Sequence, residues 1–215
     1  MIFYFFIGLI LCIMVIGLRR KLKYYFKWCS WTRKFSFLTN TRLWSFFIFN
    51  NPKSIVENLR IKPGGKVLEI GPGNGRNAIE AAKLLGPEGS LTVLEIESEY
   101  IEKLERTFKE EKAENIIVAP GNAYSLPFGN EIFDQIFFVC YVNEIPDLFK
   151  AIRECFRVLK FGGTLAFSEW MLDPFYATRS SLTKIVMESI PKSFFLKEYI
   201  SRCSRYWLIF EKGKK

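Results

Sequence analysis

The feature that most constrains the fold is a regular alternation of short apolar runs with longer amphipathic segments from Lys53 onward. Each strand-length run is followed by a turn and, in most cases, by a segment with helical periodicity. Such alternation is typical of a parallel sheet covered by helices on both faces. It predicts strands at 66–71, 90–97, 115–123, 133–142, 162–170 and 205–212, and helices at 54–61, 74–85, 98–113, 147–159 and 177–190, with Ser98 as an N-cap.

The length of the chain limits its domain organisation. Its 215 residues suffice for one large core but not for two complete domains. We therefore expect one main domain at 53–215, preceded by an apolar segment at 1–18 and a basic, aromatic segment at 19–52.

The formal charge of +9 is concentrated at the front of the chain. No Asp or Glu occurs in 1–56, and the basic residues there are Arg19, Arg20, Lys21, Lys23, Lys27, Arg33, Lys34, Arg42 and Lys53. The remaining basic residues balance the 22 acidic residues. This asymmetry indicates a negatively charged partner for the N-terminal segment, and a neutral main domain.

The segment 2–18 is uncharged, apolar and followed at once by RRKLK. As a helix it would be roughly 25 Å long, near the lower limit for crossing a hydrocarbon core of about 30 Å. It lacks a basic region before it and a small-residue cleavage site after it, which disfavours a signal peptide. We expect an uncleaved membrane anchor, and the flanking positive charges place the main domain in the cytoplasm. A buried core helix is the alternative.

Aromatic and basic side chains are interleaved in 24–37. Such a segment suits the headgroup zone of a membrane that contains anionic lipid. It could also stack on and neutralise single-stranded nucleic acid, but its position directly after an apolar run favours lipid. The segment 38–52 is predicted to form a helix that caps the main domain and ends at Asn-Asn-Pro.

Cysteine and histidine usage excludes several kinds of site. The five cysteines are widely spaced and contain no C-x-x-C pair, so neither a zinc site nor a disulfide framework is expected. The chain has no histidine, which excludes His-based metal centres and His-dependent triads. We predict no metal.

The stretch VLEIGPGNGRNA, residues 67–78, places three alternating glycines between a strand and a helix. Gly71, Gly73 and Gly75 allow a tight turn, and the following helix offers unpaired N–H groups to an anionic part of a ligand. A dinucleotide fingerprint requires a sixth-position glycine, where this chain has Arg76. Glu69 precedes the glycines, so it would repel a pyrophosphate and suit an ammonium or a sulfonium.

Four motifs in order make the segment from Lys53 to Pro174 resemble the class I S-adenosylmethionine-dependent methyltransferases, closest to the branch of the ubiquinone and menaquinone C-methyltransferases. The motifs are VLEIGPGNG, LEIESEYIEKL, PGNAYSLPFGNEIFDQI and ECFRVLKFGGTLAFSEW. The resemblance implies a Rossmann-like α/β fold with a mostly parallel seven-stranded sheet. Only PKSFFLKEYISRCS, 191–204, is available for the sixth strand, which we therefore predict to be short, missing or replaced.

The resemblance also implies a set of cofactor-binding residues. Glu69 and the three glycines would hold the methionine part, and Cys140 would line that side. Glu95, which ends the second strand, would hold the ribose hydroxyls. Ile96 would pack on adenine, and Asn122 and Ala123 would meet its edge. Asn122 stands where the family often has Asp, which keeps an acceptor but removes the charge.

Methyl transfer from a sulfonium mainly requires alignment of the nucleophile, the methyl group and the sulfur, so the absence of histidine does not argue against it. The polar residues expected nearest the acceptor are Tyr141, Asn143, Glu144, Glu169 and Trp170, and none of them is identified as a catalytic base. The anchor favours a small or lipophilic acceptor at the membrane surface, such as a prenylated quinone precursor or a phospholipid headgroup.

Three other interpretations stay open at this point. A catalytically inactive membrane scaffold could bind S-adenosylmethionine without methyl transfer. A nicotinamide oxidoreductase is disfavoured by Glu69 and Arg76. A nucleic-acid methyltransferase would use the basic front for phosphate contacts, but the apolar start disfavours it.

Overall fold

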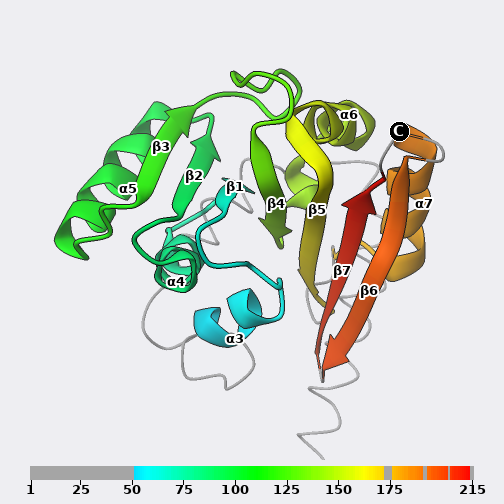
Figure 1. The fold of residues 1–215 in the computed structure, drawn as a ribbon, viewed down its shortest axis with the longest axis horizontal. Helices are drawn as coiled ribbons and strands as arrows, with labels where there is room; N and C mark the ends of the chain where they lie inside the picture. Colours follow the sequence, from blue (N-terminus) through cyan, green and yellow to red (C-terminus); the bar gives the residue numbers. More distant parts are fainter. Residues whose placement is uncertain (1–50, 172–175, 191–192, 203, 214–215) are drawn as a thin grey trace, which may run out of the picture.

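The computed structural model describes residues 51–171, 176–190, 193–202 and 204–213. These residues form three layers, with a central sheet between two layers of helices (Figure 1). The predicted membrane anchor at 1–18 and the basic, aromatic segment at 19–52 lie outside the described residues, apart from positions 51 and 52. Within the described ranges, no helix has the length and the apolar run that a membrane crossing requires.

The described strands make one seven-stranded sheet in the order β3-β2-β1-β4-β5-β7-β6. Neighbours from β3 to β5 pair in parallel, whereas β7 runs antiparallel to both β5 and β6. The strands are β1 (Lys66–Ile70), β2 (Ser90–Glu95), β3 (Ile116–Pro120), β4 (Phe133–Val139), β5 (Leu159–Trp170), β6 (Phe194–Arg202) and β7 (Arg205–Lys212). The Rossmann-like fold is therefore confirmed, as a mixed sheet.

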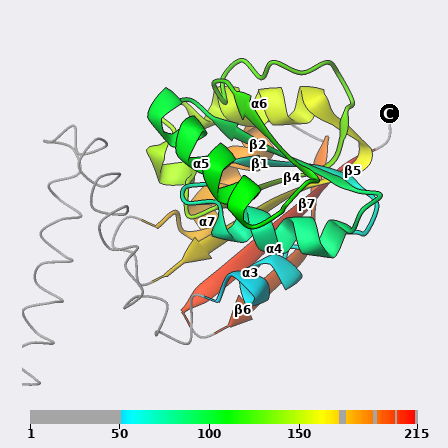
Figure 2. The same ribbon diagram turned by 90° about the vertical axis from the view of Figure 1, so that its left-hand side faces the viewer.

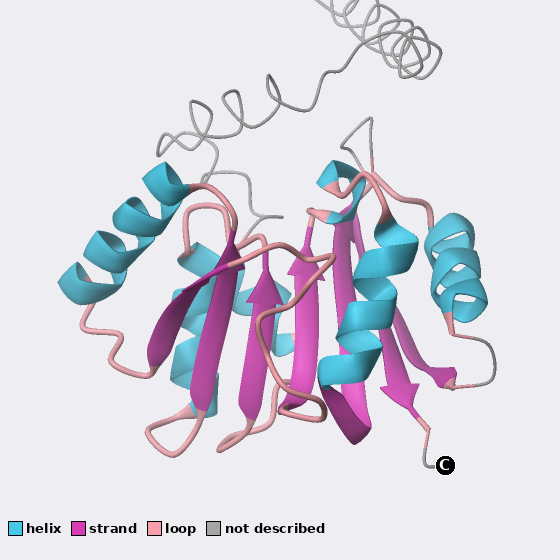
Figure 3. Cartoon of the chain, turned by 90° about the horizontal axis from the view of Figure 1, so that it is seen from above, coloured by secondary structure: helices cyan, strands magenta, loops and turns pink. Residues whose placement is uncertain are grey.

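Helices pack on both faces of the sheet, as Figures 2 and 3 show. One face carries α3 (Pro52–Glu57), α4 (Arg76–Leu85) and α5 (Ser98–Glu110), whose apolar sides share a core with residues of β1, β2, β5 and β7. The other face carries α6 (Leu148–Val158) and α7 (Arg179–Ser189). Because both faces are covered, the central strands are mostly buried and mostly apolar, without a regular alternation of polar and apolar residues.

The sixth strand corrects one sequence-based prediction. β6 is nine residues long and pairs with β7 over most of its length, so it is neither missing nor short. Its side chains are mostly exposed because it is the edge strand of the sheet, and Phe194 is its fully buried residue. An edge strand buries little apolar surface and therefore leaves a weak hydrophobic pattern.

A smaller correction concerns the start of α5. The N-cap is Glu97, one position earlier than the predicted cap, and Ser98 is the first helical residue. No side chain caps this helix; instead, Glu95 at the end of β2 accepts hydrogen bonds from the backbone N–H groups of Ile96, at 2.7 Å, and Glu97, at 3.1 Å.

Candidate active site

The predicted cofactor residues gather where the strand order reverses. The chain leaves β1 toward β2 and β3 on one side, and it returns to β4 on the other side of β1. The loops that follow β1 and β4 therefore diverge at the carboxyl edge of the sheet, which is the usual ligand position in such folds. Glu69, the glycine loop, Glu95 and Cys140 all lie at or just beyond strand ends on this edge.

The glycine loop is shaped by close packing. Gly71 has a φ of 72°, and a Cβ there would lie 2.3 Å from Cγ of Tyr141, so the tyrosine ring lies against its Cα. Gly75 has a φ of 78°, and a Cβ there would lie 2.6 Å from the Phe108 ring. Any side chain at either position would displace an aromatic ring and strain the backbone. Gly73 faces open space, with no described atom within 4 Å of an added Cβ.

Glu69 is the most unusual group at this edge. Its side chain is 1% exposed, and neither carboxylate oxygen has a hydrogen-bond partner among the described residues. Burial raises the pKa of this carboxyl to about 8. Leaving a buried carboxylate without partners is costly, and such groups are usually explained by a ligand or by function. The residue is therefore built to receive a cation or a hydrogen-bond donor.

A cavity of about 340 Å³ lies beyond the ends of β1 and β2. Ile96, Asn122 and Ala123, the three residues expected around adenine, line it together with Tyr141 and Glu144. The Ile96 side chain is 52% exposed, which leaves an apolar surface available to a planar group. The structure thus brings the three adenine residues together in one cavity.

Besides its expected contact with the adenine edge, Asn122 has a structural role. Its Oδ1 accepts a hydrogen bond from the backbone N–H of Tyr124 at 2.9 Å, and its carbonyl accepts one from Ser125 at 3.0 Å. The side chain therefore folds the turn after β3, and its oxygen can accept one further hydrogen bond. This role explains how an amide can replace a carboxylate here.

An ion pair on α6 holds the loop that leads from this turn to β4. Arg157 pairs with Glu154 at 2.7 Å and donates to the carbonyls of Leu126 and Phe128, while Glu154 accepts from the Leu126 N–H. The hydrogen bond from Arg157 lowers the pKa of Glu154. These contacts could not be predicted from the sequence, because no motif relates the loop to a helix that follows it about 20 residues later.

Cys140 follows β4 in a left-handed conformation, with a φ of 52°. Its Sγ accepts a hydrogen bond from Nη1 of Arg205 at 3.3 Å, and the same nitrogen donates to Oγ of Ser168 at 3.0 Å. Burial raises the pKa of the Cys140 thiol, and Arg205 acts in the opposite direction. Arg205, which is 3% exposed, joins the ends of β4 and β5 from β7. The sequence analysis did not find it.

The polar residues expected near the acceptor do not form one group. Tyr141 and Glu144 line the same cavity as the adenine residues, whereas Asn143 is exposed on the short 3-10 turn Val142–Glu144. Glu169 is buried within the sheet, where it lies opposite Tyr206 of β7. Trp170 ends β5 and is partly buried.

The arrangement is that of the Rossmann-like methyltransferases, as solved structures show. A SAM-dependent methyltransferase from Aquifex aeolicus aligns with a TM-score of 0.68 and 16% identity, over 74% of this chain and 88% of that one. The [4+2]-cyclase SpnF aligns with a TM-score of 0.65 and 15% identity, over 75% and 79%. At such low identity these similarities establish the fold and leave the reaction open.

Sequence comparisons identify the family. A methyltransferase domain model matches residues 61–201, more than half of the chain, so this chain belongs to that family. A demethylmenaquinone methyltransferase of Listeria welshimeri is 32% identical over 114 residues, which cover 53% of this chain and 48% of that protein. An arsenite methyltransferase of Halobacterium salinarum is 30% identical over 55% of this chain and 30% of that protein. The chain thus spans about half the length, or less, of these relatives.

The chain therefore carries a methyltransferase domain, and S-adenosylmethionine is the cofactor that this family implies. The residues described above fit this cofactor. Glu69 is a buried carboxylate without a described partner, which suits a ligand that carries an ammonium group, and Gly73 leaves the backbone beside it open. Among the described residues, no cluster of side chains could hold a metal ion.

Proposed function

We propose that this protein transfers a methyl group from S-adenosylmethionine to a lipophilic acceptor by in-line displacement. The observation that carries the donor site is the buried carboxyl of Glu69, which has no hydrogen-bond partner among the described residues. The bound cofactor supplies an activated methyl group on a sulfonium. The chain's own residues then need to bind and align it, since displacement at a sulfonium leaves a neutral group and needs little acid catalysis.

Each predicted residue receives a role in this proposal. Glu69 accepts hydrogen bonds from the cofactor's ammonium, beside the glycine loop at Gly71, Gly73 and Gly75. Glu95, which also accepts hydrogen bonds from the start of α5, accepts from the ribose hydroxyls. At the other end, Ile96 packs against the adenine ring.

The remaining residues complete the proposed site. Asn122 and Ala123 contact the adenine edge, and Cys140 lines the methionine side. Tyr141 extends this set, because its ring lies on Gly71 and also lines the adenine cavity. In this proposal it lies between the two halves of the bound cofactor and limits access from the acceptor side.

The acceptor class rests on a separate observation. The matched relatives include demethylmenaquinone methyltransferases, whose names denote a prenylated quinone substrate. We extend this class to the present chain because its first 52 residues combine an apolar run with a basic, aromatic segment. In this proposal residues 1–18 anchor the protein to a membrane, 19–52 bind anionic lipid, and the catalytic domain faces the cytoplasm.

Calorimetric titration of the full-length protein with S-adenosylmethionine tests the donor site. Glu69→Gln keeps the size of the side chain but removes its capacity for a charge, so we expect at least tenfold weaker binding, from a charged hydrogen bond of about 1.5–3 kcal/mol. Glu80→Gln, at a half-buried position of α4 where Glu80 pairs with Lys83, is the matched control and should bind as the wild type does. Equal affinities for the Glu69 variant and the control would contradict the assignment.

The acceptor is tested by incubating the purified protein with labelled S-adenosylmethionine and a total membrane lipid extract. The proposal expects label in a lipid-soluble product that is absent without enzyme. Label confined to protein or RNA would refute a lipophilic acceptor. Tight cofactor binding without transfer to any fraction would instead favour the inactive scaffold.

A further inference from the structure

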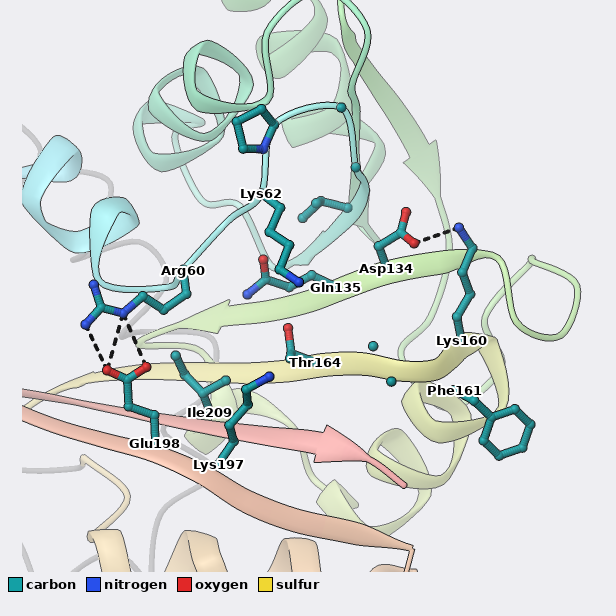
Figure 4. A pocket seen from close by; sticks show the side chains of 16 residues that line it. Arg60, Lys62, Asp134, Gln135, Lys160, Phe161, Thr164, Lys197, Glu198 and Ile209 are labelled. Atoms are coloured by element: carbon teal, nitrogen blue, oxygen red, sulfur yellow. Dashed lines mark hydrogen bonds and ion pairs between the residues drawn. The ribbon is translucent and has the colours of Figure 1, made fainter. Parts of the chain in front are cut away.

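We infer that the opposite edge of the sheet carries a second ligand site, for a phosphate group. A groove of about 450 Å³ opens there, at the amino ends of β1, β4 and β5 (Figure 4). Its floor includes Gln135, Thr164 and Ile209, which lie side by side on the face of the sheet that also carries α3. The cofactor residues are at the carboxyl ends of the same strands, so the two sites do not overlap.

The charge of this amino-edge groove is its first informative property. Four cationic side chains line it, against two anionic ones: Arg60, Lys62, Lys160 and Lys197, with Asp134 and Glu198. Cationic side chains therefore outnumber anionic ones in the lining, which suits an anionic phosphate group. The body of the protein is otherwise neutral, so this local excess is not a consequence of its overall composition.

The excess is located in the middle of the groove, because its two ends are closed by ion pairs. At one end Arg60 donates three hydrogen bonds to Glu198, the shortest at 2.8 Å, and at the other Lys160 pairs with Asp134 at 2.7 Å. Figure 4 shows these pairs as dashed lines on opposite sides of the groove. Both acidic side chains of the lining are thus paired with cations, which weakens their repulsion of an anion.

Lys62 is the cation that no described residue neutralises. The Lys62 ammonium has no hydrogen bond or ion pair within the described ranges, and the side chain reaches over the floor toward Gln135 (Figure 4). Lys197 extends from the other wall, but it pairs with Glu211, which lies outside the lining. Thr164 adds a half-buried hydroxyl to the floor between them. A lysine with a neighbouring hydroxyl is a common arrangement for binding phosphate.

The groove is held in shape by contacts of its own. Nε2 of the buried Gln135 donates to the carbonyl of Leu59 at 2.6 Å, and Asp134 accepts from the backbone N–H of Lys66 at 2.8 Å. Arg60 has a left-handed backbone, with a φ of 61°, that is uncommon for a non-glycine residue. Its side chain then spans the groove to a residue 138 positions away. The site is therefore preformed, which lowers the entropic cost of binding.

Titration of the full-length protein with inorganic phosphate, followed by calorimetry and by phosphorus NMR line width, tests this site. Lys62→Met should weaken saturable binding by about tenfold, because one charged contact is lost. The control is Lys109→Met, which removes an exposed lysine from α5 near the other end of the sheet. Both variants should bind S-adenosylmethionine as the wild type does, so a failure here is distinguishable from a failure of the proposed methyl-donor site.

A second arm identifies the source of the phosphate. The same three proteins are mixed with phosphatidylcholine vesicles that contain or lack phosphatidic acid, and binding is measured by flotation. A loss of phosphatidic acid-dependent binding in Lys62→Met, relative to Lys109→Met, supports a lipid headgroup. A loss restricted to inorganic phosphate supports a free phosphate compound. Equal behaviour of the two variants in both arms, or no saturable phosphate binding by the wild type, overturns the proposal.

Discussion

At the scale of single residues, the unusual group is Glu69, a buried carboxyl whose desolvation a cationic ligand would offset. Glu69 is almost fully buried, has no described partner and has a pKa of about 8. In the free protein at neutral pH it is therefore mostly protonated, and the buried charge is avoided. A cationic ligand would stabilise the ionised form, so binding and deprotonation of this residue are coupled.

The raised pKa of Glu69 also predicts that the stability of the free protein depends on pH. The folded-state pKa of about 8 lies above the usual value for glutamate, so the folded state holds a proton that the unfolded state loses at lower pH. Stability should therefore fall as the pH rises from about 4.3 to 8, by about 3 kcal/mol between pH 5 and pH 8 from this residue. Urea unfolding at both pH values measures it.

The comparison variant for that experiment is Glu69→Gln, which has no titrating group at this position. It should lose about 3 kcal/mol less than the wild type between the two pH values. Parallel pH profiles for the two proteins would show that Glu69 does not carry the proposed proton. A related readout is the release of a proton on cofactor binding at pH 7, seen as a dependence of the binding enthalpy on the buffer.

At the scale of elements, α3 is fastened to the sheet by hydrogen bonds from buried side chains. Nε1 of Trp207 in β7 donates to the carbonyl of Ile55 at 3.0 Å, and Gln135 in β4 donates to Leu59 just after the helix. Val56 and Leu59 are fully buried beneath it. A helix of six residues has little stability of its own, so these tertiary contacts hold it in place.

We therefore predict that Trp207→Phe destabilises the protein by about 1–3 kcal/mol, because it leaves a buried carbonyl unsatisfied and removes part of a packed ring. Hydrogen exchange should show the loss of protection mainly in α3 and the loop that follows it. Trp170→Phe, at the partly buried end of β5, is the control for loss of an indole elsewhere. Uniform loss of protection across all elements would argue against a local role.

The elements that could be predicted from the sequence are those that bury most of their residues. β1, β2 and β4 appear as apolar runs because both sheet faces are covered, and the α4 and α6 boundaries were confirmed within two residues. The prediction that the sixth strand is short or missing was wrong. As an exposed edge strand, β6 carries residues such as Lys197 and Glu198, which interrupt the apolar pattern of a strand. Arg205 was missed because its partners, Cys140 and Ser168, are brought near it only by strand order.

At the scale of the whole molecule, the parallel strands give the domain two chemically different edges. The carboxyl edge holds Glu69, the glycine loop and the cavity lined by Ile96, and the amino edge holds the basic groove around Lys62. Strands such as β1 and β4 pass through both edges, with Val67 and Gln135 at one end and Glu69 and Cys140 at or beyond the other. A ligand at either edge thus contacts elements that are shared by both.

We predict that S-adenosylmethionine stabilises the whole domain. At a concentration of about 100 times its dissociation constant it should add about 2.7 kcal/mol, which raises the melting temperature by roughly 5–10 °C. Differential scanning calorimetry of the full-length protein measures this shift. At the same cofactor concentration Glu69→Gln should show about half of this shift or less, because its binding is at least tenfold weaker. A shift of the same size in both proteins would place the cofactor's ammonium elsewhere.

The position of β7 between β5 and β6 has a consequence for synthesis of the chain. β6 leaves the ribosome before β7, yet it joins the sheet only through β7. Until β7 arrives, the open edge of β5 is exposed and β6 has no place in the sheet, which makes the nascent chain vulnerable to misassociation. Arg205, which ties the ends of β4 and β5 together, arrives with the same strand. The junction of β4 and β5 at the carboxyl edge therefore cannot be completed before β7 has been synthesised.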